Sequence, residues 1–197
     1  MKFTAATVVA ALAVAGTVQA NTVSKPTGPQ TPVEAPKYEG GYVPPSTEYA
    51  LEQLNKIRAA NGLKPVCINK SLQASAQAHA DWMARTGQHK HAPDTFQRME
   101  RYGYPGNTLR AENIAVNQNG VSDYNCFGYG PRVADVNTSA AYTTNCAWYT
   151  SQGHKDNMLT RDFNQVGIAY AKGTWAGRES YFWVQVRKLS SFHSLLF

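Results

Sequence analysis

Three short stretches decide the fold of this chain: His89-Lys90-His91, Ala111-Glu112-Asn113-Ile114-Ala115 and Ser151-Gln152-Gly153-His154-Lys155-Asp156-Asn157-Met158-Leu159. Each stretch contains a side chain that can bind a metal ion or move a proton. Each also lies within a pattern typical of a helix or a strand. Because the stretches are far apart in sequence, only the fold can bring them together, and none is a self-contained metal motif such as His-Glu-x-x-His.

The length of 197 residues is enough for one well-buried domain. Residues 1–20 predict a secretory signal, because a lysine precedes a short apolar run that ends at the small-x-small site Val18-Gln19-Ala20. A membrane anchor is the alternative, but the run falls short of the ~20 residues that span a bilayer. We therefore expect a secreted, soluble and monomeric protein, which would be periplasmic or cell-surface in a bacterium.

The remaining chain divides by composition. Residues 21–45 are rich in Pro and Thr and predict a flexible leader, because they offer little apolar surface to bury. Residues 46–189 predict the folded domain, and residues 190–197 form a C-terminal tail. The formal charge of +6 is spread along the chain without the basic stripe of a nucleic-acid reader. This charge would attract anionic lipids or acidic cell-wall polymers only weakly.

The three cysteines are Cys67, Cys126 and Cys146. In an oxidising compartment we expect one disulfide and one remaining thiol. The preferred pair is Cys126–Cys146, which would tie a glycine-rich loop to the following helix and stabilise the fold by about 3 kcal/mol. Cys67 lies between Val66 and Ile68, so it is interpreted as a buried apolar thiol. The other pairings remain open.

Helical spacing of apolar residues predicts helices over residues 46–61, 70–87, 95–102 and 138–150, and a one-turn piece at 156–159. His79 falls on the apolar face of the second helix and is interpreted as a hydrogen-bonded core residue. Residues 166–170 and 181–186 alternate as the strands of an antiparallel hairpin, with a turn at 173–177. Ile114 and Val116 indicate a further strand. The mixture predicts an α+β domain built in layers around a small antiparallel sheet.

Four motifs follow one another along the chain: Ala76-x-x-His79-Ala80-x-x-Met83-Ala84, Ala111-Glu112-Asn113-Ile114-Ala115, Trp148-x-x-Ser151-x-Gly153-His154-x-x-Asn157-Met158-Leu159 and Val166-Gly167-Ile168-Ala169-Tyr170. Together with the rest of the chain from Leu54 to Val186, they resemble the CAP superfamily of cysteine-rich secretory, antigen 5 and pathogenesis-related 1 proteins, in its compact bacterial-like form. The resemblance implies a three-layer α-β-α sandwich with an open groove on one side.

The resemblance also implies which residues line the groove. Its two histidines fall on His91 and His154, and its first acid falls on Glu112. His89 is the alternative to His91, but the segment after His91 resembles the family better. Ser151 stands where longer members carry the second acid, and an alanine precedes Glu112 where glycine is usual.

Two neutral imidazoles, His91 and His154, can hold Zn²⁺ or another divalent cation, with Glu112 as a third ligand. Glu112 can instead orient a histidine or act as a general base on a bound water. A purely structural role is the competing interpretation, in which Glu112 joins a loop to the sheet and His154 caps a helix. Ser151 beside His154 suggests a serine nucleophile only weakly, because no nucleophile elbow or oxyanion hole accompanies it.

The favoured function is an extracellular binding module for a lipid, sterol or cell-surface ligand. Tyr124, Phe127, Tyr129 and Tyr142 can form an apolar site for a sterol or fatty acyl chain, or can pack a long loop onto the domain. One alternative is a metal-dependent hydrolase that uses Glu112 as its general base. The other is a surface interaction protein, of a virulence or defence type, whose groove is vestigial.

Overall fold

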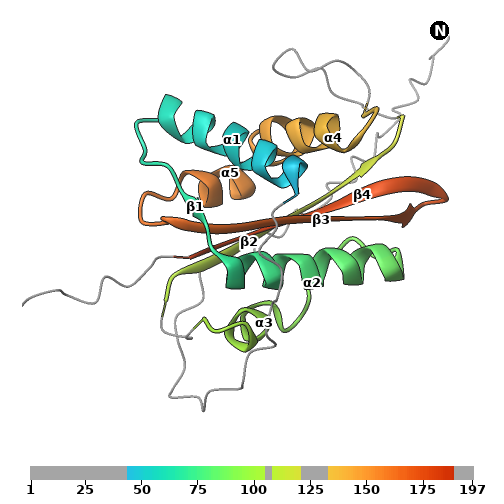
Figure 1. The fold of residues 1–197 in the computed structure, drawn as a ribbon, viewed down its shortest axis with the longest axis horizontal. Helices are drawn as coiled ribbons and strands as arrows, with labels where there is room; N and C mark the ends of the chain where they lie inside the picture. Colours follow the sequence, from blue (N-terminus) through green and yellow to red (C-terminus); the bar gives the residue numbers. More distant parts are fainter. Residues whose placement is uncertain (1–43, 105–107, 121–132, 189–197) are drawn as a thin grey trace, which may run out of the picture.

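The computed structural model describes residues 44–104, 108–120 and 133–188. Two layers of helices enclose a four-stranded sheet, as Figure 1 shows. One face of the sheet is covered by α1 (Pro45–Ala60), α4 (Val136–Tyr142) and α5 (Gln152–Leu159). The other face is covered by α2 (Lys70–Thr86) and α3 (Thr95–Arg101). The predicted three-layer α-β-α sandwich is confirmed.

The sheet has the strand order β1 (Cys67–Ile68), β3 (Gln165–Trp175), β4 (Arg178–Lys188), β2 (Arg110–Gln118). β3 pairs antiparallel with β4, and β4 with β2, whereas the two residues of β1 run parallel to β3. The sheet is therefore mixed rather than purely antiparallel. β2 forms one outer edge, and the candidate site is built around this edge.

The hairpin between β3 and β4 turns later than the sequence suggested. Both strands continue past Gly173, and the turn is formed by Ala176 and Gly177, with φ of 50° and 78°. A turn with two positive φ values matches the twist of a two-residue hairpin. Gly173 instead allows α2 to pack closely against β3, because a Cβ at this position would lie 2.6 Å from the carbonyl oxygen of Ala84 on α2.

Two hydrophobic cores fill the spaces on either side of the sheet. The core between the sheet and the layer of α1, α4 and α5 contains Leu54, Trp148, Met158, Ile168 and Trp183, all fully buried. The core between the sheet and the layer of α2 and α3 contains Leu72, Met83, Met99, Phe182 and Val184, also fully buried. Successive residues of β4 thus alternate between the two cores, as the period of a strand requires.

Local signals fix α2 at both ends. The Asn69 side chain accepts hydrogen bonds from the backbone N–H groups of Ser71 and Leu72, and Gly87 ends the helix with a φ of 62°. These are the N-cap and left-handed C-cap expected of such residues. The boundaries predicted for this helix are confirmed.

The second half of the chain contains two departures from the predicted helices. The helix expected over residues 138–150 begins at Val136 and passes from α4 into a π-helical segment, η1 (Thr143–Trp148). The one-turn piece expected at 156–159 is an eight-residue helix, because α5 begins directly after Ser151. His154 therefore lies in the first turn of α5.

Helix α2 packs directly against the backbone of β3, beyond the end of the short β1. The N–H of Ile168 donates to Gln73 Oε1 at 2.9 Å, and the amide of Gln73 donates back to the carbonyl of Ile168. Gln77 donates to the carbonyl of Tyr170 at 2.9 Å. The approach is so close that a Cβ on Gly167 would lie 2.2 Å from the backbone of Leu72.

The expectation for Cys67 is wrong. Its side chain is exposed, because strand alternation at β1 turns Val66 inward, at 1% exposure, and Cys67 outward. Cys126, the predicted partner of Cys146, lies outside the described residues, so this disulfide stays a prediction. The signal at 1–20, nearly all of the leader and the tail at 190–197 also lie outside them.

Candidate functional site

The candidate site is organised by two consecutive residues of the edge strand β2, Glu112 and Asn113. Neighbouring residues of a strand point to opposite faces of a sheet. Glu112 accordingly faces the layer of α2 and α3, whereas Asn113 faces α5 in the opposite layer. Each of the two contacts one of the segments that carry the predicted groove histidines.

The carboxylate of Glu112 is buried and accepts hydrogen bonds from three side chains. Its carboxylate has no exposed surface and forms an ion pair with Arg98 of α3. Its Oε1 atom also accepts from His91 Nδ1 at 2.8 Å and from the Thr95 hydroxyl at 3.3 Å. Thr95 and Arg98 lie three residues apart on α3, which places them on the same side of this helix.

The charge of Glu112 is fixed by these contacts. Burial alone raises the pKa of the Glu112 carboxyl, but the charge of Arg98 and the hydrogen bond from His91 outweigh burial and lower the pKa to about 2. The group is therefore a carboxylate at any physiological pH. A carboxylate can only accept hydrogen bonds, so His91 Nδ1 must carry the proton of their shared bond.

This bond fixes the tautomer and the orientation of the His91 ring. With the proton on Nδ1, the neutral imidazole has its lone pair on Nε2. The side chain is 17% exposed, so it lies at the surface end of the buried Glu112. A carboxylate that accepts a hydrogen bond from one nitrogen of a histidine is a common partner of metal-binding histidines, because it fixes the tautomer and orientation of the ring.

Asn113 holds the helix that carries the second histidine. Its Nδ2 atom donates to the backbone carbonyl of His154 at 3.1 Å, and its Oδ1 atom accepts from the Asn157 side chain at 2.9 Å. These two contacts, three residues apart, fasten the first turns of α5 to the edge of the sheet. The position of His154 is thus tied to the same strand that fixes His91.

His154 is half-buried, and its ring is incompletely paired. Its Nδ1 atom is buried and has no hydrogen-bond partner. Burial, followed by the charges of His91 and His89, lowers the pKa of His154 to about 4, so the ring is neutral at pH 7. Glu112 bonds to His91 on one face of β2, and the neighbouring Asn113 bonds to the backbone of His154 on the other face, whereas the meeting of the two rings stays a prediction.

His79 supports the loop that carries His91. Its ring is 2% exposed, stacks on Trp82 at 5.5 Å between centroids, and its Nε2 atom lies 3.1 Å from the Lys90 carbonyl. Burial is the main cause that lowers the pKa of His79 to about 4. The prediction of a hydrogen-bonded core histidine is confirmed. His89 instead lies edge-on to Trp175, and the hydrogen bond to Glu112 belongs to His91.

Ser151 has no part in the hydrogen bonds described above. It is the N-cap residue of α5, but its hydroxyl makes no capping bond, and its carbonyl accepts from Lys155 N at 2.8 Å. Across the described segments, no three His, Cys, Asp or Glu side chains converge as a metal-binding group. A metal site formed by His91 and His154 therefore stays a prediction.

Sequence reasoning missed two residues of the site. Arg98, the partner of Glu112, lies 14 positions from it and carries no motif of its own. The only available signal was a charged residue next to Met99 on a short, mostly polar helix. The role of Asn113 was accessible in principle, because strand alternation places it opposite Glu112.

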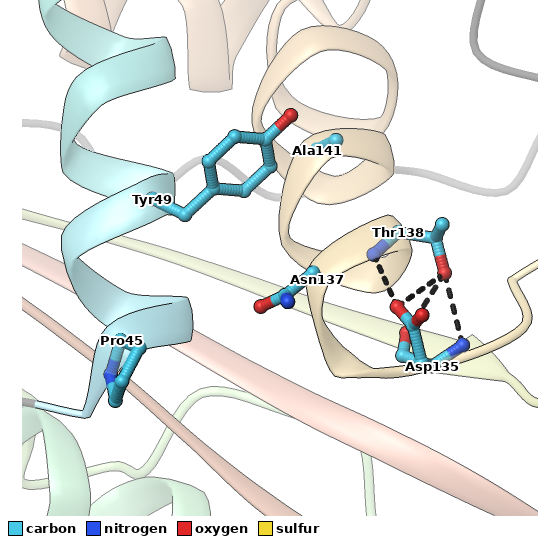
Figure 2. A pocket seen from close by; sticks show the side chains of 6 residues that line it. All are labelled: Pro45, Tyr49, Asp135, Asn137, Thr138 and Ala141. Carbon is cyan, nitrogen blue, oxygen red and sulfur yellow. Dashed lines mark hydrogen bonds between the residues drawn. The ribbon is translucent and has the colours of Figure 1, made fainter.

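A separate cavity of about 430 Å³ lies between the N-terminal parts of α1 and α4. Figure 2 shows Tyr49 of α1 pointing towards α4, with Asn137 between the two helices and Asp135 bonded to Thr138 in a capping box. Pro45 and Ala141 complete the lining. Of the aromatic residues expected to bind a lipid, Tyr142 is partly buried beside the core, and the other three, at 124, 127 and 129, lie outside the described residues.

Known proteins resemble this chain both in sequence and in fold. The model of the cysteine-rich secretory protein family, CAP, matches residues 51–186. The uncharacterized protein YkwD from Bacillus subtilis (strain 168) is 26% identical over 126 residues, which cover 62% of this chain and 41% of YkwD. This chain thus spans about two fifths of the length of that relative.

Solved structures of low identity share the fold. An outer surface protein from Borrelia burgdorferi is 17% identical, with a TM-score of 0.52 over 74% of this chain and 93% of that one. NaASP2, in a crystal structure with Zn²⁺, is 14% identical, with a TM-score of 0.50 over 78% and 83% of the two chains. In the part of the chain described here, no helix is both long and apolar enough to cross a bilayer. The match of the family model to most of the chain, together with the layered fold, shows that this protein belongs to the CAP family of cysteine-rich secretory proteins.

Proposed function

We propose that this protein is an extracellular binding module that holds a divalent metal ion, Zn²⁺ in the first instance, between His91 and His154. The observation that carries the proposal is the hydrogen bond of 2.8 Å from His91 Nδ1 to the buried carboxylate of Glu112. It selects the tautomer whose Nε2 lone pair is free to bind a metal.

The second donor is also suited to this role. Metal binding requires neutral imidazole, and the lowered pKa of His154, about 4, keeps its ring neutral at pH 7. Its buried Nδ1 atom lacks a partner, and a ligand would supply one. Two imidazoles completed by water would form a weak, exchangeable site rather than a structural one.

We assign Glu112 to orienting His91 rather than to binding the metal or activating water. Both of its oxygen atoms already accept hydrogen bonds, and its carboxylate has no exposed surface. A general base works best when its pKa lies near the operating pH, and a pKa of about 2 is far below it. These facts favour the binding module over the metal-dependent hydrolase.

An extracellular location is supported by the family and by the predicted signal at residues 1–20. The family is named for its secretory members, and the structural relative from Borrelia burgdorferi is an outer surface protein. Secretion is tested by expressing the full chain in a secreting host and determining the N-terminus of the exported protein. Retention of residues 1–20 on the mature protein would contradict this part of the proposal.

The metal site is tested by titration calorimetry with ZnCl₂ at pH 7. We expect the unaltered protein to bind Zn²⁺, and His91→Ala and His154→Ala each to abolish binding. Gln88→Ala is the matched control, since it changes an exposed side chain of the same loop, and it should retain full affinity. Glu112→Gln should weaken binding roughly 10–100-fold, as loss of an orienting partner does. Binding that survives His91→Ala would refute the site.

The cavity between α1 and α4 supports a second ligand class, a fatty acyl chain or sterol. Its volume of about 430 Å³ falls in the range of small-molecule sites, and Pro45, Tyr49 and Ala141 form an apolar part of a lining that also contains Asp135, Asn137 and Thr138. A fluorescent fatty acid should bind the unaltered protein, and Asn137→Trp, which fills the space beside Tyr49, should prevent binding. Glu52→Trp, on an exposed part of α1, is the control that should not. Equal binding by all three proteins would exclude the cavity.

A further inference from the structure

Two arginines are fully buried beneath α5. Arg58 of α1 is 0% exposed and Arg187 of β4 is 1% exposed. Arginine stays protonated in proteins, so both sites hold a positive charge. Within the described ranges, neither guanidinium forms an ion pair with a carboxylate, unlike the buried Arg98 with Glu112.

The two positive charges lie close together. Nη1 of Arg58 and Nη1 of Arg187 both donate to the carbonyl oxygen of Met158, each at 2.8 Å. Arg58 completes its bonds with three further backbone carbonyls, those of Lys64, Thr160 and Phe163. Burial, together with the charge of Arg58, lowers the pKa of Arg187 well below its ordinary value. Carbonyl dipoles at the end of α5 offset part of this repulsion, but they supply no full negative charge.

Arg187 also has a donor that nothing accepts. Its Nε atom donates to Gln185 Oε1 at 2.8 Å, but its buried Nη2 atom has no hydrogen-bond partner. Nε2 of Gln185, a residue with no exposed surface, is buried and unpaired as well. The Nε and Nη2 hydrogens of a guanidinium point in the same direction. The unpaired Nη2 of Arg187 and the unpaired Nε2 of Gln185 therefore lie close to each other, and neither has a hydrogen-bond acceptor.

We propose that a small monovalent anion of halide size, such as chloride, is bound there by Nη2 of Arg187 and Nε2 of Gln185. An anion satisfies both donors and balances charge next to the two guanidiniums, whereas a water molecule would satisfy the donors and leave both charges uncompensated. The complete burial of Arg58, Arg187 and Gln185 favours a single-atom ion over a larger oxyanion or carboxylate.

The anion would strengthen the attachment of α5 to the sheet. Gln185 Oε1 accepts from Asn113 at 3.2 Å, and Asn113 in turn holds the His154 carbonyl. The bound ion is therefore joined through two side chains to the helix that carries His154. Its effect is on the stability of this region and is independent of whether the histidines bind a metal.

The direct test is a crystal of the full secreted chain grown in sodium bromide, measured at the bromine absorption edge. We expect an anomalous peak within hydrogen-bonding distance of Arg187 Nη2 and Gln185 Nε2. An ordered water, a carboxylate of the chain, or no bromine signal at this position would overturn the proposal. This experiment uses the unaltered protein and so does not depend on a variant folding.

The second test measures thermal unfolding in chloride and in gluconate at constant ionic strength, since gluconate is too large to enter. Above the dissociation constant, each tenfold rise in chloride should raise the midpoint by about 3–6 °C. Arg187→Met should lose this dependence, and Arg178→Met, at an exposed position of the same strand, should retain it. Equal midpoints in chloride and gluconate for the unaltered protein would refute the anion.

Discussion

Acid should destabilise this protein well above the pH at which its carboxylates titrate. His79 and His154 are held neutral in the folded chain, where burial is the main cause that lowers each pKa from 6.5 to about 4. The unfolded chain therefore binds more protons than the folded chain between pH 6.5 and pH 4. The stability from these rings is fully present above pH 6.5 and is lost as the pH falls towards 4.

The magnitude follows from the two pKa values of each ring. Lowering the pH from 7 to 5 should remove about 2 kcal/mol of unfolding free energy for each fully shifted histidine. For His79 and His154 together, the loss is a large fraction of the total stability of an ordinary domain. Glu112 does not offset it, because its pKa of about 2 leaves it ionised throughout this range.

Urea denaturation at pH 7 and pH 5, followed by tryptophan fluorescence, measures this loss. His79→Phe keeps an aromatic ring against Trp82 and removes the titrating group. The variant should be less stable than the unaltered protein at pH 7, because the bond to the Lys90 carbonyl is lost. Its stability should nevertheless change by about 2 kcal/mol less between the two pH values. If the variant shows the full pH dependence of the unaltered protein, burial of His79 is not its cause.

Three further outcomes are expected. Arg98→Met should cost roughly 3–5 kcal/mol of unfolding free energy at pH 7, because it leaves Glu112 buried and unpaired; a loss below ~1 kcal/mol would contradict the ion pair. Gln73→Leu should cost about 2–5 kcal/mol in the same urea assay, since the buried N–H and C=O of Ile168 lose their partners, and a neutral effect would show that the helix does not rely on these bonds. Cys67 should react with a thiol reagent in the native protein, and Cys67→Ser should abolish the reaction; continued reaction would identify a second accessible thiol.

What the sequence predicted well depends on local signals. Asn69 and Gly87 fix the ends of α2 through contacts with their own neighbours, so both boundaries were accessible without the fold. Helical period placed His79 in the core for the same reason. The joint position of His91 and Glu112 came from the order of motifs along the chain, and the hydrogen bond between them is consistent with it.

What the sequence did not predict depends on contacts between distant segments. Arg98 pairs with Glu112 only because α3 lies against β2, and no local pattern encodes this packing. Cys67 has apolar neighbours on both sides, but the pairing of β1 with β3 decides which of the three side chains points outward. The π-helical η1 likewise has no signal in its own residues that distinguishes it from an ordinary helix.

The two glutamines that bond to β3 affect how the protein associates with itself at high concentration. Gln73 and Gln77 occupy the backbone groups that an additional strand would need beyond the end of β1. A second copy cannot extend the sheet on that side without first displacing α2. At high protein concentration, this contact should prevent edge-to-edge pairing through β3, which is the route by which exposed strands begin to aggregate.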